Sequence, residues 1–176
     1  MLLKDFIEFL ESKGELIRIK EFTDPLLEIT EITDRVSKQP GGGKALLFEN
    51  TGTAYPVLTN MLGSKNRILY ALGATSFDEI SESMRDLIKE VTRQRGTIQE
   101  KLKAIPLLGR AASWMPKAHK GVAPCQEVIL HQPDIGRLPV LKCWPQDGGA
   151  FITLPLVHTK DPVTGARNVG MYRMQV

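Results

Sequence analysis

The residues best suited to chemistry lie in one short stretch, RNVGMYRMQV, residues 167–176. The amide oxygen of Asn168 is a hard ligand of the kind that magnesium and manganese bind. The guanidinium of Arg173 suits bidentate binding of a carboxylate or a phosphate. Polar side chains are costly in a largely apolar strand unless they have partners. A ligand site and a row of surface polar groups on an edge strand are therefore both open interpretations.

Extended backbone would divide this stretch into two faces, because side chains alternate along a strand. One face would carry Asn168, Gly170, Tyr172 and Met174, and the other Arg167, Val169, Met171, Arg173 and Gln175. Gly170, in the middle, indicates a bulge or a position where a ligand approaches the backbone.

Other polar motifs carry weaker signals. The run GGGK at residues 41–44 lacks the flanking residues of a phosphate-binding loop and precedes a strand, so we predict a helix-to-strand turn. The three histidines, His119, His131 and His158, share no metal-ligand spacing.

For DGG at residues 147–149, we favour a plain turn over a ligand-facing loop. For the basic residues between 85 and 120, we favour a solvated helix face and a connector over a patch for phosphate or an acidic substrate.

The elements that must position these residues alternate in type through the first half of the chain. Apolar spacing predicts helices over residues 3–12, 26–36 and 77–91, and strands over 15–20, 45–48 and 56–61. Asp24 followed by Pro25 is predicted to cap the second helix, and Ser76 with Glu79 to form a capping box on the third. This alternation predicts an α/β domain.

Helical spacing ends after residue 95. Glycine and proline recur over residues 96–124, which predicts a connector or a lid. The predicted strands that follow, with a hairpin turn at 161–165, are 127–130, 138–142, 151–159 and 168–176. We place the domain boundary near residue 116, which gives domains over 1–115 and 116–176. The last strand runs to the final residue, so we expect the second domain to be incomplete.

Composition excludes several classes of protein. The chain has 176 residues and a formal net charge of +3, with 42% hydrophobic and 24% charged residues, which is ordinary for a globular protein. We find no apolar run long enough to span a bilayer and no signal peptide. Cys125 and Cys143 have no CxxC spacing, so reduced thiols are expected. We therefore predict a cytoplasmic protein and leave membrane association open.

Residues 147–176 resemble the signature of the UbiD family of decarboxylases, typified by 3-polyprenyl-4-hydroxybenzoate carboxy-lyase of ubiquinone synthesis. Several earlier segments resemble the family's N-terminal portion in the same order: FIEFLESKGELIRI, DPLLEITEITDRV, KALLFENTG, PVLTNMLGS and the APCQEVIL/DIGRLPVLKCWPQD region. The resemblance implies an N-terminal α/β domain followed by the first strands of a flavin-type split β-barrel.

The resemblance also implies a cofactor and a substrate class. The family uses prenylated FMN, held with a divalent metal (usually manganese) and a monovalent cation such as potassium, to decarboxylate aromatic or α,β-unsaturated acids. By match to the family's RNxGxYR pattern, Asn168 would ligate the metal, and Met171, Tyr172 and Arg173 would line the flavin. Arg173 also resembles the arginine of the family's Glu-Arg-Glu network, which orients the substrate carboxylate and a proton-transferring glutamate, so it is the expected catalytic residue.

The remaining metal ligands, a histidine and a glutamate, and both acids of the network come from later strands in the family. We therefore expect this chain by itself to be inactive, and His158 cannot replace the missing histidine. A flavin prenyltransferase as cofactor supplier and a homo-oligomer are the implied partners. The alternative is a non-catalytic assembly or ligand-binding module derived from the family. A nucleic-acid or membrane-surface patch over residues 93–120 is disfavoured, because only Trp114 is there to stack on bases.

Overall fold

The computed structural model describes residues 2–93, 105–106, 109, 112 and 120–176. The chain divides into two compact units, of which one joins Met1–Ala71 to Asp134–Val176 and the other is Leu72–Pro133. The predicted domain boundary near residue 116 lies outside the described residues, as do much of the predicted connector and the larger part of the basic stretch. Each unit is described by itself below.

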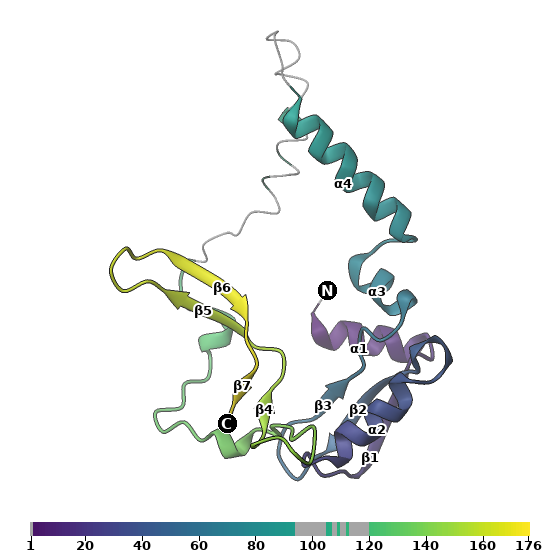
Figure 1. Cartoon of the computed structure of the whole chain (residues 1–176), viewed down its shortest axis with the longest axis vertical. Helices are drawn as coiled ribbons and strands as arrows, with labels where there is room; N and C mark the ends of the chain where they lie inside the picture. Colours follow the sequence, from purple (N-terminus) through teal and green to yellow (C-terminus); the bar gives the residue numbers. More distant parts are fainter. Residues whose placement is uncertain (1, 94–104, 107–108, 110–111, 113–119) are drawn as a thin grey trace. The chain divides into compact units, whose positions relative to one another are not determined.

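A three-stranded sheet with the order β1-β2-β3 organises the first unit (Figure 1). Its strands are β1 (Leu16–Phe22), β2 (Ala45–Asn50) and β3 (Val57–Thr59). β1 and β2 are parallel, and β2 and β3 are antiparallel. The helices that precede and connect these strands are α1 (Leu3–Ser12) and α2 (Glu28–Ser37), with α3 (Lys65–Leu72) after β3. The predicted helix over 3–12 and the three predicted strands are confirmed.

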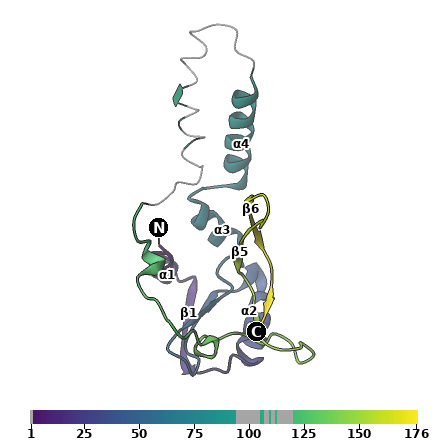
Figure 2. The same ribbon diagram turned by 90° about the vertical axis from the view of Figure 1, so that its left-hand side faces the viewer.

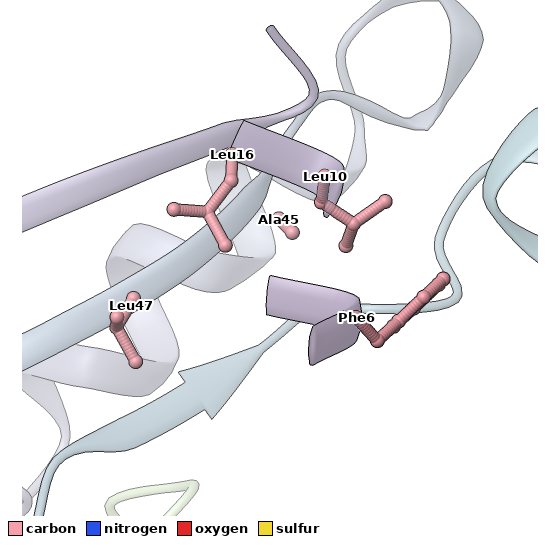
Figure 3. Close-up of a cluster of buried hydrophobic side chains, with 5 residues drawn as sticks. All are labelled: Phe6, Leu10, Leu16, Ala45 and Leu47. Atoms are coloured by element: carbon pink, nitrogen blue, oxygen red, sulfur yellow. The ribbon is translucent and has the colours of Figure 1, made fainter. Parts of the chain in front are cut away.

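The central strand β2 is buried on both faces. Ala45 and Leu47 pack with Phe6 and Leu10 of α1, as Figure 3 shows. Leu46 and Phe48 pack with Ile29 of α2. Because successive side chains of a strand point to opposite faces, α1 and α2 cover opposite faces of the sheet. Each fully buried Leu, Ile or Phe contributes about 1.5–3 kcal/mol, so this double cover is the main source of the unit's stability.

The start of α2 differs from the prediction. The helix begins at Glu28, and its N-cap is Leu27, which has a φ of +73°. Asp24 instead closes a local turn: its carboxylate accepts the Leu26 N–H at 2.8 Å, and its own N–H donates to Glu28 at 2.7 Å. The predicted Asp24 cap is therefore wrong. The hydrogen bonds of Asp24 form a turn that precedes the helix, and the N-cap position belongs to Leu27.

The glycine-rich run forms the predicted helix-to-strand turn. A short 3₁₀ turn, η1 (Pro40–Gly42), follows α2 and leads directly into β2. A β-carbon at Gly43 would lie 2.0 Å from the Val36 carbonyl oxygen, so only glycine fits this close approach.

The second unit contains α4 (Phe77–Thr92), in teal in Figures 1 and 2. Ser76 caps it by accepting the Glu79 N–H at 3.1 Å, as predicted. The Glu79 carboxylate accepts hydrogen bonds from the Thr75 N–H at 2.8 Å and from the Thr75 hydroxyl at 2.6 Å, and the hydroxyl is the main cause that lowers the pKa of Glu79. Among the residues that the structure describes, no helix has both the length and the hydropathy needed to cross a membrane.

The strands of the C-terminal part are shorter than predicted and lie partly at other positions. The short elements before the hairpin are η2 (Pro124–Gln126), η3 (Ile135–Arg137) and β4 (Phe151–Ile152), and the later strands are β5 (Leu156–Lys160), β6 (Arg167–Met171) and β7 (Met174–Gln175). The predicted strand over 127–130 is wrong, since those residues are exposed bends and loop. Residues 138–142 contribute only two isolated bridges, at Leu141 and Lys142.

The mixed α/β class is confirmed, but a closed or split barrel is not seen in the described residues. β4 pairs with β7 and β5 pairs with β6, both antiparallel, as separate two-stranded ladders. Leu26 bridges to Lys142 and the Thr30 hydroxyl donates to the Cys143 carbonyl at 3.1 Å, which joins residues 141–143 to the α2 region within the first unit.

Candidate functional site

The hairpin of β5 and β6 carries the predicted metal ligand. Its register is regular, from Leu156 opposite Met171 to Lys160 opposite Arg167. Asp161 closes the predicted turn by accepting hydrogen bonds from the backbones of Val163 and Thr164 and from the Thr164 hydroxyl. The Thr164 N–H is the largest of the causes that hold the pKa of Asp161 below its ordinary value of 3.8. The ionised carboxylate of Asp161 therefore stabilises the turn of the hairpin.

Asn168 is exposed in β6, opposite Thr159 of β5. Its amide oxygen is of the type that a divalent cation binds, and exposure leaves it accessible to one. Within the described part of the chain, no group of three or more His, Cys, Asp or Glu side chains could hold a metal. Asn168 thus fits the role of one ligand, and the described residues do not complete a metal site.

Gly170 does not form the predicted bulge. The ladder continues through it without a change of register, with Val157 as its partner. A β-carbon at Gly170 would lie 2.4 Å from the Tyr172 ring, because that ring covers the glycine. Gly170 therefore lies in close contact with the outer end of a neighbouring aromatic side chain, a contact that was not considered from the sequence.

The strand predicted over residues 168–176 is interrupted after Met171. Pro155 lies in the matching gap between β4 and β5, and proline has no N–H to donate to a ladder. Three residues separate β4 from β5, whereas two separate β6 from β7, so the two ladders are offset by one residue. The predicted two-face pattern therefore does not extend as one strand beyond Met171, and both Met171 and Tyr172 are more than half exposed.

Arg173 lies in this gap and makes two specific contacts. Its Nη2 donates to Oδ2 of Asp147 at 2.9 Å, and the centre of its guanidinium lies 3.6 Å from the centroid of the Phe151 ring. Stacking on an aromatic face and pairing with a carboxylate are both favourable for arginine. The Arg173 side chain is 45% exposed, so part of the guanidinium remains accessible to a ligand.

Asp147 is a site residue that the sequence analysis did not identify. It belongs to the DGG motif, for which a plain turn was favoured, and its carboxylate also accepts the Trp144 N–H at 3.1 Å. A signal was present in the sequence: antiparallel pairing of the predicted strands 151–159 and 168–176 brings the DGG turn to the end that carries Arg173. An acid and a base at the same end of a strand pair favour an ion pair.

Two cavities lie beside this region, within the first unit. One, of about 520 Å³, is lined by Val57, Leu58, Thr59, Asn60, Met61, Leu138, Pro139, Val140, Leu141 and residues 151–154. The other, of about 630 Å³, is lined by α2 side chains with Thr59, Leu141, Cys143, Trp144 and Pro145. Phe151, the ring over which the Arg173 guanidinium lies, belongs to the wall of the first cavity.

The structure thus brings Arg173 together with Asp147 and Phe151, whereas Asn168 lies five positions earlier in the hairpin. His158 is exposed opposite Val169, and His119 lies outside the described residues. Cys125 and Cys143 are free thiols. The arrangement can bind an anion at Arg173 and supply one hard oxygen ligand at Asn168.

Solved structures that superpose on this chain include a vanillic acid decarboxylase and a UbiD-class enzyme. Vanillic acid decarboxylase of Sedimentibacter hydroxybenzoicus in its closed form superposes with a TM-score of 0.71 at 28% identity, over 99% of this chain and 34% of that one. The UbiD-class enzyme HmfF of Pelotomaculum thermopropionicum, in an evolved dimeric form in complex with prFMN, superposes with a TM-score of 0.64 at 27% identity, over 98% and 35%. The same enzyme in complex with FMN gives a TM-score of 0.65 at 29% identity, over 98% and 34%.

Two uncharacterized proteins are more similar in sequence. One, from Aquifex aeolicus strain VF5, is 51% identical over 99% of this chain and 36% of its own length. The other, from Archaeoglobus fulgidus, is 45% identical over 99% of this chain and 35% of its own length. The chain therefore spans about a third of the length of the curated relatives that it matches.

Two family models match the chain in succession. Residues 7–87 match the N-terminal domain of 3-octaprenyl-4-hydroxybenzoate carboxy-lyase, and residues 117–176 match the Rift-related domain of the same enzyme. The second match includes the hairpin, Arg173 and Asp147. With both models in order along most of the chain, and with UbiD-class enzymes as structural neighbours, this protein belongs to the UbiD family of decarboxylases.

Proposed function

We propose that this chain is the N-terminal part of a prenylated-FMN-dependent decarboxylase of aromatic or α,β-unsaturated acids. The observation that carries the proposal is the superposition of 98% of the chain on a UbiD-class enzyme in complex with prFMN. The default substrate is 3-polyprenyl-4-hydroxybenzoate, after the enzyme for which the matching models are named. We also propose the division into domains 1–115 and 116–176, with the second contributing the first strands of a split β-barrel; the ranges matched by the two models support it.

The overall reaction exchanges carbon dioxide for a proton. The bond between the carboxyl carbon and the ring or alkene carbon breaks, the electron pair stays on that carbon, and a proton takes the place of carbon dioxide. Bound prenylated FMN supplies the acceptor for that electron pair. The acid must be held with its carboxylate oriented and with water excluded before the bond breaks.

In this proposal, the chain's own residues bind and orient. Asn168 provides one oxygen ligand to a divalent ion, Mn²⁺ by preference, which neutralises the cofactor phosphate together with a monovalent cation such as K⁺. Met171 and Tyr172 line the flavin, and their exposure leaves apolar and aromatic surface free for a ring to cover. Arg173 keeps a permanent positive charge and binds the substrate carboxylate, which makes it the proposed catalytic residue.

We further propose that the isolated chain is inactive, since the described residues provide one metal ligand and one arginine but no metal cluster. The proposed partners are a flavin prenyltransferase, which would supply the cofactor, and further copies of the chain in a homo-oligomer. The proposed location is the cytoplasm, with membrane association left open.

The test is reconstitution of the purified chain with Mn²⁺ and either FMN or prenylated FMN from a strain that also expresses a flavin prenyltransferase. Retained flavin is measured by absorbance and mass spectrometry after desalting. We expect flavin to be retained in a Mn²⁺-dependent manner, and Asn168→Ala to weaken retention at least about tenfold. Asn66→Ala, at an exposed asparagine of α3, is the matched control and is expected to leave retention unchanged.

Decarboxylation is measured on the same samples with 4-hydroxybenzoate as the probe acid, by release of carbon dioxide. We expect no release above background. Sustained turnover would overturn the proposed inactivity of the chain. Failure to retain either flavin in the presence of Mn²⁺ would overturn the cofactor site and would favour the non-catalytic assembly or ligand-binding module.

A further inference from the structure

The guanidinium of Arg173 is restrained from two directions at once. The guanidinium lies over the Phe151 ring, with 3.6 Å between the guanidinium carbon and the ring centroid. Asp147 accepts one hydrogen bond from Nη2 at 2.9 Å. A stack fixes the plane of the group, and a directed hydrogen bond fixes its rotation within that plane. Together the two contacts determine where its remaining N–H groups point.

Asp147 is itself rigidly held, which makes it suitable as an anchor. Its carboxylate accepts the Trp144 N–H at 3.1 Å, and its own N–H donates to the Trp144 carbonyl at 3.1 Å. The two following glycines lie against Gln175, whose Nε2 would be 3.1 Å from a β-carbon at Gly148. The Asp147 side chain is 16% exposed, much less than the 45% of Arg173. The less exposed member of the pair therefore restrains the more exposed one.

The pairing leaves most of the guanidinium free. Arginine has five N–H donors, and Asp147 takes one of them. Among the described residues, the structure records no other hydrogen bond from the Arg173 side chain. The donors that remain are enough for a bidentate contact with a second carboxylate, which binds without breaking the contact to Asp147.

We infer that Asp147 is a positioning residue: together with the Phe151 ring, it holds the guanidinium of Arg173 in the orientation that receives the carboxylate of the acid substrate. This inference rests on the proposed function, because that function is what makes Arg173 the carboxylate-binding group. Asp147 acts through Arg173 and does not contact the reacting atoms. The DGG motif, for which the sequence favoured a plain turn, does form bends at residues 147–149, and Asp147 has this additional role there.

The first test measures the position of Arg173 without any cofactor. In the ¹⁵N- and ¹³C-labelled chain, we expect the Phe151 ring current to shift the guanidinium resonances of Arg173 upfield. We expect Asp147→Asn, which keeps an oxygen for the Trp144 N–H, to abolish most of that shift. Asp161→Asn makes the same chemical change in the hairpin turn, away from Arg173, and is expected to preserve it. An unchanged Arg173 signal in Asp147→Asn would overturn the inference.

The second test titrates sodium benzoate into the same chains and follows the Arg173 resonances. We expect Asp147→Asn to weaken benzoate binding about fivefold, because an ion pair between partly exposed groups has a modest effect. In an Arg173→Lys background, Asp147→Asn is expected to have no further effect, whereas a merely structural role would still be visible there.

The outcomes separate the two ideas. If benzoate does not perturb Arg173 in the unmodified chain, or Arg173→Lys binds it equally well, the proposed carboxylate-binding role is wrong. If Arg173→Lys weakens binding and Asp147→Asn does not, the proposed function stands and the positioning role of Asp147 is overturned. Thermal unfolding followed by circular dichroism identifies any variant that has lost its fold. If Asp147→Asn is such a variant, Asp147→Glu is used in its place, and it must show the Arg173 shift of the unmodified chain.

Discussion

A single buried arginine holds together the loops around the first sheet. Arg67 of α3 has no exposed surface, and its guanidinium donates to Glu15 and to the Gly43 carbonyl, both at 2.7 Å. It also donates to the carbonyls of Met61 and Asn60, at 3.2 and 3.3 Å. A charge can be buried when it is paired and hydrogen-bonded in this way. The sequence does not indicate the burial of Arg67, because a lone arginine in an amphipathic helix has no distinguishing local pattern.

We predict that Arg67→Met lowers the free energy of unfolding by about 3 kcal/mol. Removing one partner of a buried pair leaves Glu15 and several carbonyls without their donor. Urea unfolding followed by circular dichroism measures the loss. Arg35→Met is the control, since Arg35 pairs with Glu31 on the exposed surface of α2 and such a pair is worth under about 0.5 kcal/mol. Equal losses for the two variants would contradict the structural role of Arg67.

At the scale of elements, the turn between α2 and β2 depends on the space around its glycines. Gly41 and Gly42 both have positive φ, of +77° and +87°. A β-carbon at Gly41 would meet no atom within 4 Å, whereas one at Gly42 would lie 1.8 Å from the Gly63 carbonyl oxygen. Both positions therefore favour glycine because of their positive φ. Only Gly42 also lacks the space for a β-carbon.

We predict that Gly41→Ala costs about 1–2 kcal/mol of unfolding free energy, from the left-handed backbone alone. Gly42→Ala adds a clash with the backbone and is expected to cost at least about 1–3 kcal/mol more. Urea unfolding of both variants gives the difference directly. If Gly42→Ala is no worse than Gly41→Ala, the loop after β3 does not approach η1 as closely as described.

At the scale of the whole molecule, burial is very uneven. The first four residues of β2 are buried, whereas β5 and β6 are mainly exposed. Large apolar side chains such as Leu156, Val169 and Met171 are more than half exposed on the hairpin. The sheet that α1 and α2 cover is the stable part of the chain, and the region of the proposed site has few buried contacts of its own.

We predict a matching contrast in hydrogen exchange. Backbone amides of β2 are expected to exchange at least about tenfold more slowly than those of β6, because opening β2 requires unfolding of the packed sheet. Exchange followed by NMR or mass spectrometry resolves the two segments. Adding Mn²⁺ and FMN is expected to slow exchange in β6 selectively if the proposed cofactor site is correct. Similar protection of both strands in the free chain would contradict the uneven burial.

The sequence by itself was enough for the helix over 3–12, the first three strands, the glycine turn, the hairpin at 161–165 and the family, because these depend on local periodicity, turn chemistry and a contiguous motif. It failed at three places: Asp24 closes a local turn before α2, residues 127–130 form no strand, and Pro155 lies in the gap between the last ladders. The roles of Asn168, Met171, Tyr172 and Arg173 remain predictions from the family pattern. Only the tertiary structure placed Asp147 and Phe151 on Arg173 and the Tyr172 ring over Gly170. Ion pairs and close packing form between chain segments whose approach is determined by the fold, and no local pattern records that approach.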